Sequence, residues 1–183
     1  MLTLMAPVIG LAALAVYLET GGPVLYRALR VGKDGVDFEM LKLRTMRTGS
    51  DGLSITASGD PRVTRIGSIL RHTKIDELPQ LINVLRGEMS LVGPRPEVRR
   101  YVDMFPSEFS RIHSVLPGIT GVGSLAYRNE SEILGRYEQP EEAYVTEILP
   151  DKLALETRYV ERRSLFTNLE LIARTLKSVI YGS

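Results

Sequence analysis

The stretch Arg71-His72-Thr73-Lys74-Ile75-Asp76-Glu77-Leu78-Pro79-Gln80 joins a basic run to the start of an apolar segment. Pro79 and the apolar residues after it predict the opening of a helix, because the first turn of a helix tolerates proline. The adjacent carboxylates of Asp76 and Glu77 are therefore expected near a helix N-terminus. Free backbone N–H groups and the positive end of the helix dipole favour an ionised carboxylate there, and equally a bound phosphate.

Two interpretations of Asp76 and Glu77 are open. An Asp just before a helix is a common capping residue, and a Glu in the first turn is ordinary. The other interpretation is acid, metal or phosphate chemistry, because nearby cations would keep Asp76 ionised and would attract a polyanionic substrate. The segment from Asp60 onward supplies four such cations and has Asp60 itself as its one acid before Asp76. The four cations are Arg62, Arg65, Arg71 and Lys74.

The composition of the 183 residues predicts one folded domain with a core, since 44% are hydrophobic and 25% are charged. A formal net charge of +1 argues against a general nucleic-acid-binding protein, so no nucleic-acid partner is expected. The absence of Cys excludes thiol catalysis, Cys-ligated zinc and disulfide bonds. His72 and His113 stand far apart without the spacing of metal ligands. Carboxylates and cations are left as the candidates for chemistry.

The N-terminal segment predicts a membrane contact. Residues 1–18 carry no charge and approach the length of a membrane-spanning helix, but Pro7 predicts a break or kink near residues 5–7. We therefore expect residues 1–20 to form a shortened re-entrant or interfacial membrane helix, with a buried core helix as the alternative. The excess of Arg and Lys after it predicts that residues 21–183, the expected catalytic domain, face the cytoplasm.

A β-hairpin is predicted after this helix, because Gly32-Lys33-Asp34-Gly35 is typical of a turn and residues 36–46 alternate in the manner of a strand. That strand would place Lys42 and Arg44 on one face. Residues 48–62 are rich in Gly, Ser, Asp and Thr and predict a loop. The expected fold class is α+β, predominantly helical, with a small β-hairpin or sheet.

The C-terminal segment predicts an amphipathic helix. Its apolar residues recur at helical spacing: Leu169, Ile172, Leu176 and Val179. We expect this stripe to pack on the core, and an interfacial membrane helix is the alternative.

Two segments rich in proline and glycine are candidate ligand loops. In Gly93-Pro94-Arg95-Pro96 the prolines fix the backbone around Arg95, whose guanidinium suits a phosphate because two N–H donors can engage two oxygens. The run Pro117-Gly118-Ile119-Thr120-Gly121-Val122-Gly123 would allow close approach of the backbone to a ligand. A simple surface turn is the alternative for each segment.

Seven motifs follow one another in order along the chain: Ala6-Pro7, Gly22-Pro23-Val24, Lys42-Leu43-Arg44-Thr45-Met46, Asp60-Pro61-Arg62-Val63-Thr64-Arg65-Ile66-Gly67, Asp76-Glu77-Leu78-Pro79-Gln80-Leu81, Met89-Ser90-Leu91-Val92-Gly93-Pro94-Arg95-Pro96 and Pro117-Gly118-Ile119-Thr120-Gly121. With Tyr159-Val160-Glu161-Arg162-Arg163-Ser164-Leu165 near the C-terminus, this ordered set resembles the bacterial sugar transferase family. Its members are the monotopic polyprenyl-phosphate phosphoglycosyl transferases.

The resemblance implies a magnesium-dependent enzyme at the cytoplasmic face of the bacterial inner membrane. Such an enzyme moves a sugar 1-phosphate from a UDP-sugar to polyprenyl (undecaprenyl) phosphate and releases UMP. This transfer begins the synthesis of surface glycans such as exopolysaccharides and other glycoconjugates. The implied partners are the UDP-sugar, polyprenyl phosphate and inner-membrane lipid, and a homodimer is included among the candidate assemblies.

The resemblance also implies roles for single residues. Asp76 would be the nucleophile that takes the sugar phosphate, and Glu77 would assist it as a metal ligand or acid-base group, with both carboxylates as candidate Mg²⁺ ligands. The implied phosphate-binding residues are Arg95, Arg71, Lys42 and Arg44. The residues implied for the nucleotide or sugar are Pro117, Gly118, Thr120, Gly121 and Arg128.

Two departures from the family pattern limit what carries over. Relatives usually have a longer apolar helix before the proline, so the stretch before Pro7 looks shortened. Residues 121–130 differ from the Gln and Gly-Arg-Asn that many relatives carry, so the sugar cannot be assigned. Two other functions are considered: a membrane-anchored scaffold of the same fold with impaired catalysis, and a prenyl-diphosphate phosphohydrolase.

Overall fold

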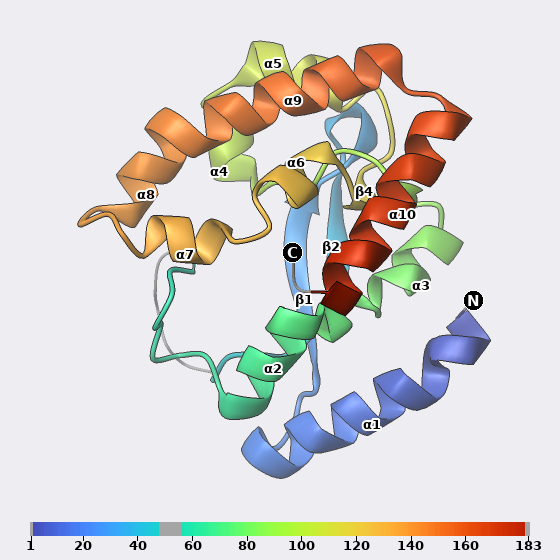
Figure 1. Cartoon of the computed structure of the whole chain (residues 1–183), viewed down its shortest axis with the longest axis vertical. Helices are drawn as coiled ribbons and strands as arrows, with labels where there is room; N and C mark the ends of the chain where they lie inside the picture. Colours follow the sequence, from blue (N-terminus) through green and yellow to red (C-terminus); the bar gives the residue numbers. More distant parts are fainter. Residues whose placement is uncertain (1, 48–55, 182–183) are drawn as a thin grey trace.

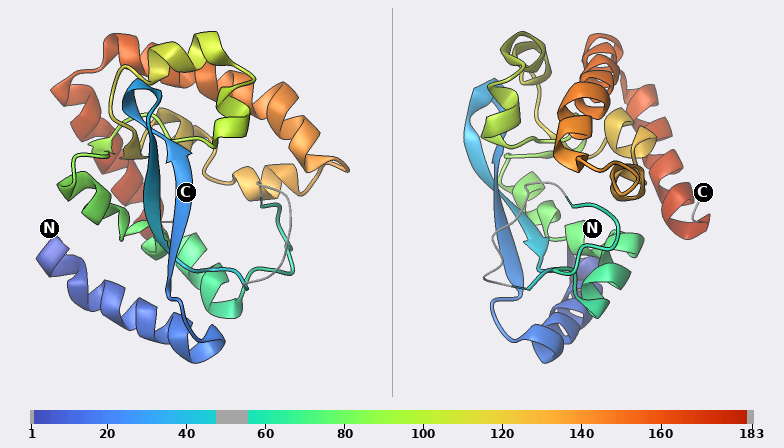
Figure 2. Two further views of the ribbon diagram at one scale, coloured as in Figure 1. Left: turned by 180° about the vertical axis from the view of Figure 1, so that it is seen from behind. Right: turned by 90° about the vertical axis from the view of Figure 1, so that its left-hand side faces the viewer.

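The computed structural model describes residues 2–47 and 56–181, and the N-terminal part of the predicted loop over 48–62 lies outside them. Figures 1 and 2 show a long β-hairpin on one face of the molecule, with helices packed on its other side. The helices are α1 Leu2–Thr20, α2 Arg65–Thr73, α3 Gln80–Leu85, α4 Arg99–Val102, α5 Pro106–Ile112, α6 Val122–Ala126, α7 Glu130–Leu134, α8 Pro140–Ala143, α9 Leu149–Arg162 and α10 Leu165–Tyr181. Two 3₁₀ turns, η1 Lys33–Gly35 and η2 Ile75–Glu77, and a π-helical turn, η3 Tyr144–Ile148, complete them.

The predicted hairpin is confirmed. Strands β1 (Leu25–Val31) and β2 (Asp37–Leu43) pair antiparallel, with Leu25 opposite Leu43 and Val31 opposite Asp37. The turn between them uses left-handed backbone at Asp34 (φ 56°) and Gly35 (φ 73°), which Asp and Gly tolerate better than most residues. The α+β class is confirmed as well, since helices dominate and the sheets are small.

A second, parallel pair joins β3 (Ser90–Val92) to β4 (Gly118–Thr120). A Cβ atom on Gly118 would overlap the backbone of Gly93, and one on Gly121 would overlap the Gly93 carbonyl oxygen. These glycines are therefore required by backbone packed against backbone. The predicted close approach is real, but its partner is the neighbouring strand.

Helix α1 lies along one edge of the molecule and contacts α2, β2 and η2 (Figure 1). Its buried face consists of Ala12 and Val16, which pack on Leu43 and Leu70. Of the break or kink predicted at Pro7, the break is wrong, because α1 continues through this residue. Pro7 stands near the beginning of the helix, where it removes one backbone hydrogen bond and leaves the later turns intact. Within residues 2–47 and 56–181, no helix combines the length and apolar character needed to cross a bilayer.

The largest core lies under α9 and α5 and includes Tyr101, Tyr144 and Leu149. Helix α10 packs on a separate cluster through Leu171, beside Val92 and Tyr159. The predicted core stripe of α10 is confirmed in part, since Ile172 packs against this cluster, whereas Leu169 is 57% exposed and Leu176 is 58% exposed. Helical spacing identifies the apolar face of a helix but not how much of that face is covered. Figure 2 shows that α10 lies at the outside of the fold, so part of its apolar face stays exposed.

Candidate functional site

Asp76 and Glu77 lie in the 3₁₀ turn η2, between α2 and α3. Helix α2 ends at Thr73, and its C-cap Lys74 adopts a left-handed conformation (φ 59°, ψ 15°) that turns the chain into η2. The predicted helix after the carboxylates is present, but α3 begins at Gln80 with Pro79 as its N-cap and no side-chain capping bond. The capping interpretation of Asp76 is therefore wrong, because an intervening turn separates the side chain from the first turn of α3.

Glu77 is held by two cations from distant parts of the chain. Its Oε1 atom accepts hydrogen bonds from Lys42 Nζ at 3.2 Å and from Arg95 Nη2 at 2.7 Å. All three side chains are mostly buried, so the ion pairs are little screened by water. Burial alone would raise the pKa of Glu77, but the charges of Arg95 and Lys42 lower that pKa well below its usual range.

Asp76 has the opposite electrostatic character. It is only 6% exposed, and its Oδ1 atom has no hydrogen-bond partner among the described residues. Burial first, and then the adjacent charge of Glu77, raise the pKa of Asp76 above its usual value, although Lys42, Lys74 and Arg71 oppose this. The prediction that surrounding cations favour ionisation of Asp76 is thus reversed, because the strongest cations are committed to Glu77. A buried, unpartnered carboxylate oxygen is a candidate ligand or nucleophile.

The two other predicted phosphate-binding residues, Arg71 and Arg44, lie in different places. Arg71 donates from Nε to Thr45 Oγ1 at 2.8 Å and contributes to the field at Asp76, so it lies at the site. Arg44 does not, because its buried guanidinium donates to the backbone carbonyls of Thr20, Gly21 and Gly22 at 2.5 to 3.3 Å. Strand β2 ends at Leu43, and Arg44 serves as a C-terminal cap for α1.

Arg95 is fixed by the backbone on both sides, as the prolines predict. Gly93 N donates to Thr120 O at 2.9 Å, and Gly118 N donates to Pro94 O at 2.8 Å. These bonds belong to the β3–β4 pair, so the sheet holds the Arg95 guanidinium against Glu77. Arg95 is thus presented by a rigid loop to the carboxylate turn.

The residues expected to bind nucleotide or sugar fall in two places. Pro117, Gly118 and Gly121 are occupied by packing around β4, and Thr120 Oγ1 lies 2.6 Å from Thr175 Oγ1 on α10. Arg128, by contrast, lines a cavity of about 560 Å³ between the α6–α7 connection and α10. Of this predicted set, Arg128 is the residue that lines this cavity.

Sequence reasoning missed Glu156 on α9. Its Oε1 accepts a hydrogen bond from Gly123 N at 3.2 Å and a longer one from Arg95 N at 3.4 Å, so it links α6 to the Arg95 loop. Burial raises the pKa of Glu156 to about 7. A usable signal exists in the sequence: Leu149, Lys152, Leu153, Glu156 and Tyr159 share the buried face of α9, which places two charged residues at core positions.

A divalent cation fits the carboxylate turn. No group of three or more His, Asp or Glu side chains suited to a metal occurs among the described residues. Mg²⁺, however, is often held by one or two carboxylates together with substrate phosphates and water. The unpartnered Oδ1 of Asp76 meets this requirement, whereas the oxygens of Glu77 already face Arg95.

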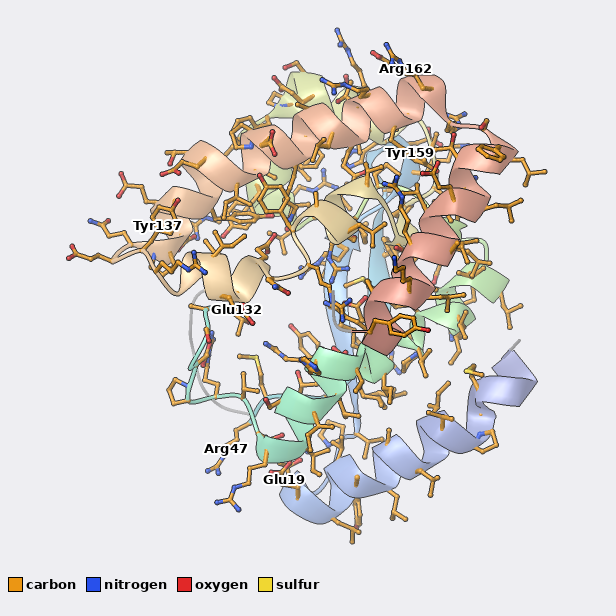
Figure 3. The ribbon with its side chains drawn as sticks, viewed as in Figure 1. Glu19, Arg47, Glu132, Tyr137, Tyr159 and Arg162 are labelled. Atoms are coloured by element: carbon orange, nitrogen blue, oxygen red, sulfur yellow. The ribbon has the colours of Figure 1, made fainter. Side chains whose placement is uncertain are left out.

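Helix α1 contacts the helix that precedes the carboxylate turn. Figure 3 labels Glu19 and Arg47 close together where the C-terminal end of α1 meets α2. Glu19 accepts hydrogen bonds from Arg65 N at 2.9 Å and Ile66 N at 3.1 Å, so α1 supplies an acidic cap to the N-terminus of α2. Because α2 leads directly into η2, α1 supports the carboxylate turn from behind.

Comparisons with known proteins identify the family of the chain. The family model described as "Bacterial sugar transferase" matches residues 1–182. The chain is 40% identical to a UDP-glucose:undecaprenyl-phosphate glucose-1-phosphate transferase of Caulobacter vibrioides, over 97% of this chain and 64% of that protein.

Two further relatives are similar. A UDP-N-acetylgalactosamine-undecaprenyl-phosphate N-acetylgalactosaminephosphotransferase of Aeromonas hydrophila is 35% identical, over 98% of this chain and 40% of that protein. The exopolysaccharide production protein PSS of Rhizobium leguminosarum bv. phaseoli is 35% identical over 97% of this chain and 88% of that protein. The chain thus spans less than two thirds of the first two relatives. The match over nearly all of its residues establishes that the chain belongs to the bacterial sugar transferase family.

Proposed function

We propose that this chain is a phosphoglycosyl transferase that moves a sugar 1-phosphate from a UDP-sugar to polyprenyl phosphate. The observation that carries the proposal is the buried Oδ1 of Asp76, which has no hydrogen-bond partner within residues 2–47 and 56–181, although the charges of Lys42, Lys74 and Arg71 act on this carboxyl. A carboxylate left unsatisfied in such a place is suited to receive a phosphorus centre or a metal. The names of the Caulobacter and Aeromonas relatives supply the substrate class.

The proposed reaction has two displacements at the same phosphorus atom. In the first, an oxygen of Asp76 bonds to the sugar-bearing phosphorus of the donor, and the bond to the bridging oxygen breaks, so that UMP leaves with that oxygen. In the second, a phosphate oxygen of polyprenyl phosphate bonds to the phosphorus and releases Asp76. The product is a polyprenyl diphosphate sugar, and a covalent intermediate divides one transfer into two easier steps.

Glu77 is assigned a positioning role. Its lowered pKa keeps it ionised at neutral pH, so it is a poor proton donor. Its ion pairs instead hold Lys42 and Arg95 beside Asp76, where their charges face an incoming diphosphate. When the donor binds, its phosphates would share these cations with Glu77.

Magnesium is the cofactor we propose, with Asp76 as its main protein ligand and Glu77 as a second candidate. When bound, Mg²⁺ neutralises phosphate charge and polarises the phosphorus centre. Lys74 and Arg71 would contribute the remaining positive potential around the diphosphate.

We also propose that the chain works at the cytoplasmic face of the bacterial inner membrane. Polyprenyl phosphate is a lipid, so the acceptor must be met at a bilayer surface. Helix α1 offers an apolar face outside the core, formed by Leu11, Leu14 and Leu18. This face supports an interfacial position for the helix.

The proposed activity is tested by measuring UMP release from a panel of UDP-sugars, with Mg²⁺ and polyprenyl phosphate present. We expect release by the unaltered chain to need both additions, and Asp76→Asn to lose at least about a thousandfold in rate. The matched control is Asp103→Asn, at an exposed position after α4, which should keep full activity. Full activity of Asp76→Asn would refute the assignment. Mass spectrometry of the denatured chain after exposure to donor alone should detect a sugar-phosphate adduct.

A further inference from the structure

The cavity between the α6–α7 connection and α10 has an unusual charge balance. Its volume is about 560 Å³, within the range of small-molecule sites. Four cations and a single acid, Glu132, contribute to its lining. The cations are Arg128, Arg136, Arg174 and Lys177.

Most of this positive charge is not neutralised by the protein. Arg174 pairs with Glu170 at 2.7 Å, one helical turn away. The described residues offer no ion-pair partner to Arg128, Arg136 or Lys177, and Arg128 Nη1 is buried without a hydrogen-bond acceptor. A buried donor without an acceptor is costly, so an anionic ligand would stabilise this arrangement.

The rest of the lining suits a nucleoside better than a bare phosphate. Leu125 and Ile133 provide apolar surface for a base, and Asn129 and Ser178 provide hydrogen-bonding groups for base or ribose. Figures 1 and 2 both show α6 against α10, and Figure 3 labels Glu132 on α7. The cavity is therefore built by three elements that come together only in the folded chain.

The cavity also lies within electrostatic range of the carboxylate site. Glu130, next to the lining residue Asn129, raises the pKa of Arg95 together with Glu77. Lys152 holds Glu130 in place through a 2.7 Å ion pair. The charge of Glu130, at the start of α7, thus contributes to the field at Arg95.

We propose that this cavity binds the nucleoside monophosphate end of the donor, with Arg128, Arg136 and Lys177 contacting its phosphate. The inference rests on the proposed function and adds a location for the part of the donor that leaves as UMP. It assigns a ligand-binding role to α10, whose basic residues the sequence motifs do not include.

The test is calorimetric titration of the full chain with UMP, which binds without turnover. We expect Arg136→Gln and Lys177→Gln each to weaken UMP binding about tenfold, since each removes one charge-assisted contact. Arg128→Gln should weaken binding at least as much, and the two exposed variants decide the question if Arg128→Gln fails to fold. The matched control, Arg111→Gln on the exposed surface of α5, should bind UMP normally.

Parallel titrations separate the sources of phosphate. Inorganic phosphate and phosphatidylglycerol vesicles are titrated against the same variants. The proposal expects the unaltered chain to bind UMP more tightly than inorganic phosphate, and the variants to lose UMP binding without losing vesicle binding. Unchanged UMP affinity in both exposed variants, or a loss confined to the vesicles, would overturn it. This test and the activity test can fail separately. If the unaltered chain releases UMP but the cavity variants bind UMP normally, the cavity inference alone is overturned. If UMP binds at the cavity but the chain shows no turnover, the proposed function alone is overturned.

Discussion

Adjacent carboxylates can have opposite electrostatic roles, as Asp76 and Glu77 do. The two side chains leave neighbouring positions of one 3₁₀ turn. Glu77 faces Arg95 and Lys42, whereas one oxygen of Asp76 has no hydrogen-bond partner in the part of the chain that the structure describes. The pKa of Glu77 is accordingly lowered and that of Asp76 raised. The turn therefore combines a fixed anion that orders the cations with a second carboxylate available to a ligand.

Substitution of these two residues should affect stability in opposite directions. Glu77→Gln leaves Lys42 and Arg95 buried without their counter-ion, and we expect it to lower the free energy of unfolding by about 3 kcal/mol. Asp76→Asn removes a carboxylate whose ionised form is disfavoured in the folded state, so at neutral pH it should leave that free energy unchanged or raise it. Urea denaturation of both variants measures the difference, and equal destabilisation would contradict the division of roles.

Glu156 should make stability depend on pH. Its carboxyl has a pKa of about 7 in the folded chain against 4.5 in the reference state, so the folded chain retains a proton that the unfolded chain has lost. The free energy of unfolding should therefore fall as the pH rises from about 4.5 to about 7, by up to roughly 3 kcal/mol from this group.

Glu156→Gln tests this directly, because its amide oxygen can still accept from Gly123 N and Arg95 N but does not titrate. We expect the difference in unfolding free energy between variant and unaltered chain to grow in favour of the variant from about pH 5 to about pH 8. Denaturant titrations across this range provide the measurement. A constant difference would show that Glu156 titrates normally.

The sequence predicts those site residues that lie close together along the chain or whose backbone is fixed by neighbouring prolines. Asp76, Glu77 and Arg95 belong to short motifs, and the prolines around Arg95 do restrict it. The contacts of Arg44 could not be predicted in this way, because its side chain donates to the end of α1, whereas alternation alone places it beside Lys42. Such contacts depend on tertiary packing and not on spacing.

At the scale of the element, the hairpin and α2 form one unit. Gly67 in α2 packs directly against the backbone of Thr45, just after β2, and a Cβ atom there would overlap the Thr45 carbonyl oxygen. The same contact brings Arg71 to Thr45 Oγ1. The distance between α2 and the strand therefore influences where the carboxylate turn lies.

Two Gly-to-Ala substitutions in helices should have opposite effects. Gly67→Ala is expected to lower the free energy of unfolding by about 2 kcal/mol, because backbone must move to admit the methyl group. Gly10→Ala in α1 meets no atom within 4 Å and should raise it by about 0.5 kcal/mol through helix propensity. Thermal or urea unfolding measures both, and a stabilising Gly67→Ala would contradict the packing described.

The sequence predicts the presence of helices and strands more reliably than the side on which each of them packs. The hairpin followed from its Gly-rich turn, and α10 followed from apolar spacing. The spacing did not predict which side of α10 packs on the core. Leu171 is covered by Val92 and Tyr159, while Leu169 remains exposed. The identity of the covering residues is a property of the assembled fold.

At the scale of the whole molecule, α1 carries apolar surface that the described core does not use. Leu11 is 70% exposed and Leu18 is 76% exposed, and they share a helical stripe with Leu14. Ala12 and Val16 on the opposite side are buried against α2 and β2. An apolar stripe of this kind on a firmly packed helix is suited to the bilayer interface.

Replacing this stripe should release the chain from membranes without unfolding it. Each leucine transferred from water into the acyl region contributes about 1.5 kcal/mol or more, so the triple change Leu11→Ser, Leu14→Ser and Leu18→Ser should weaken binding to phosphatidylglycerol vesicles by at least about a hundredfold in co-sedimentation. The matched control changes exposed apolar residues of the hairpin, Leu29→Ser and Val36→Ser, and should bind normally. Equal loss in both variants would mean that α1 is not the membrane-facing element. A normal melting temperature of the triple variant is expected because its side chains lie outside the core, whereas Val16→Ser, 2% exposed, should lower it.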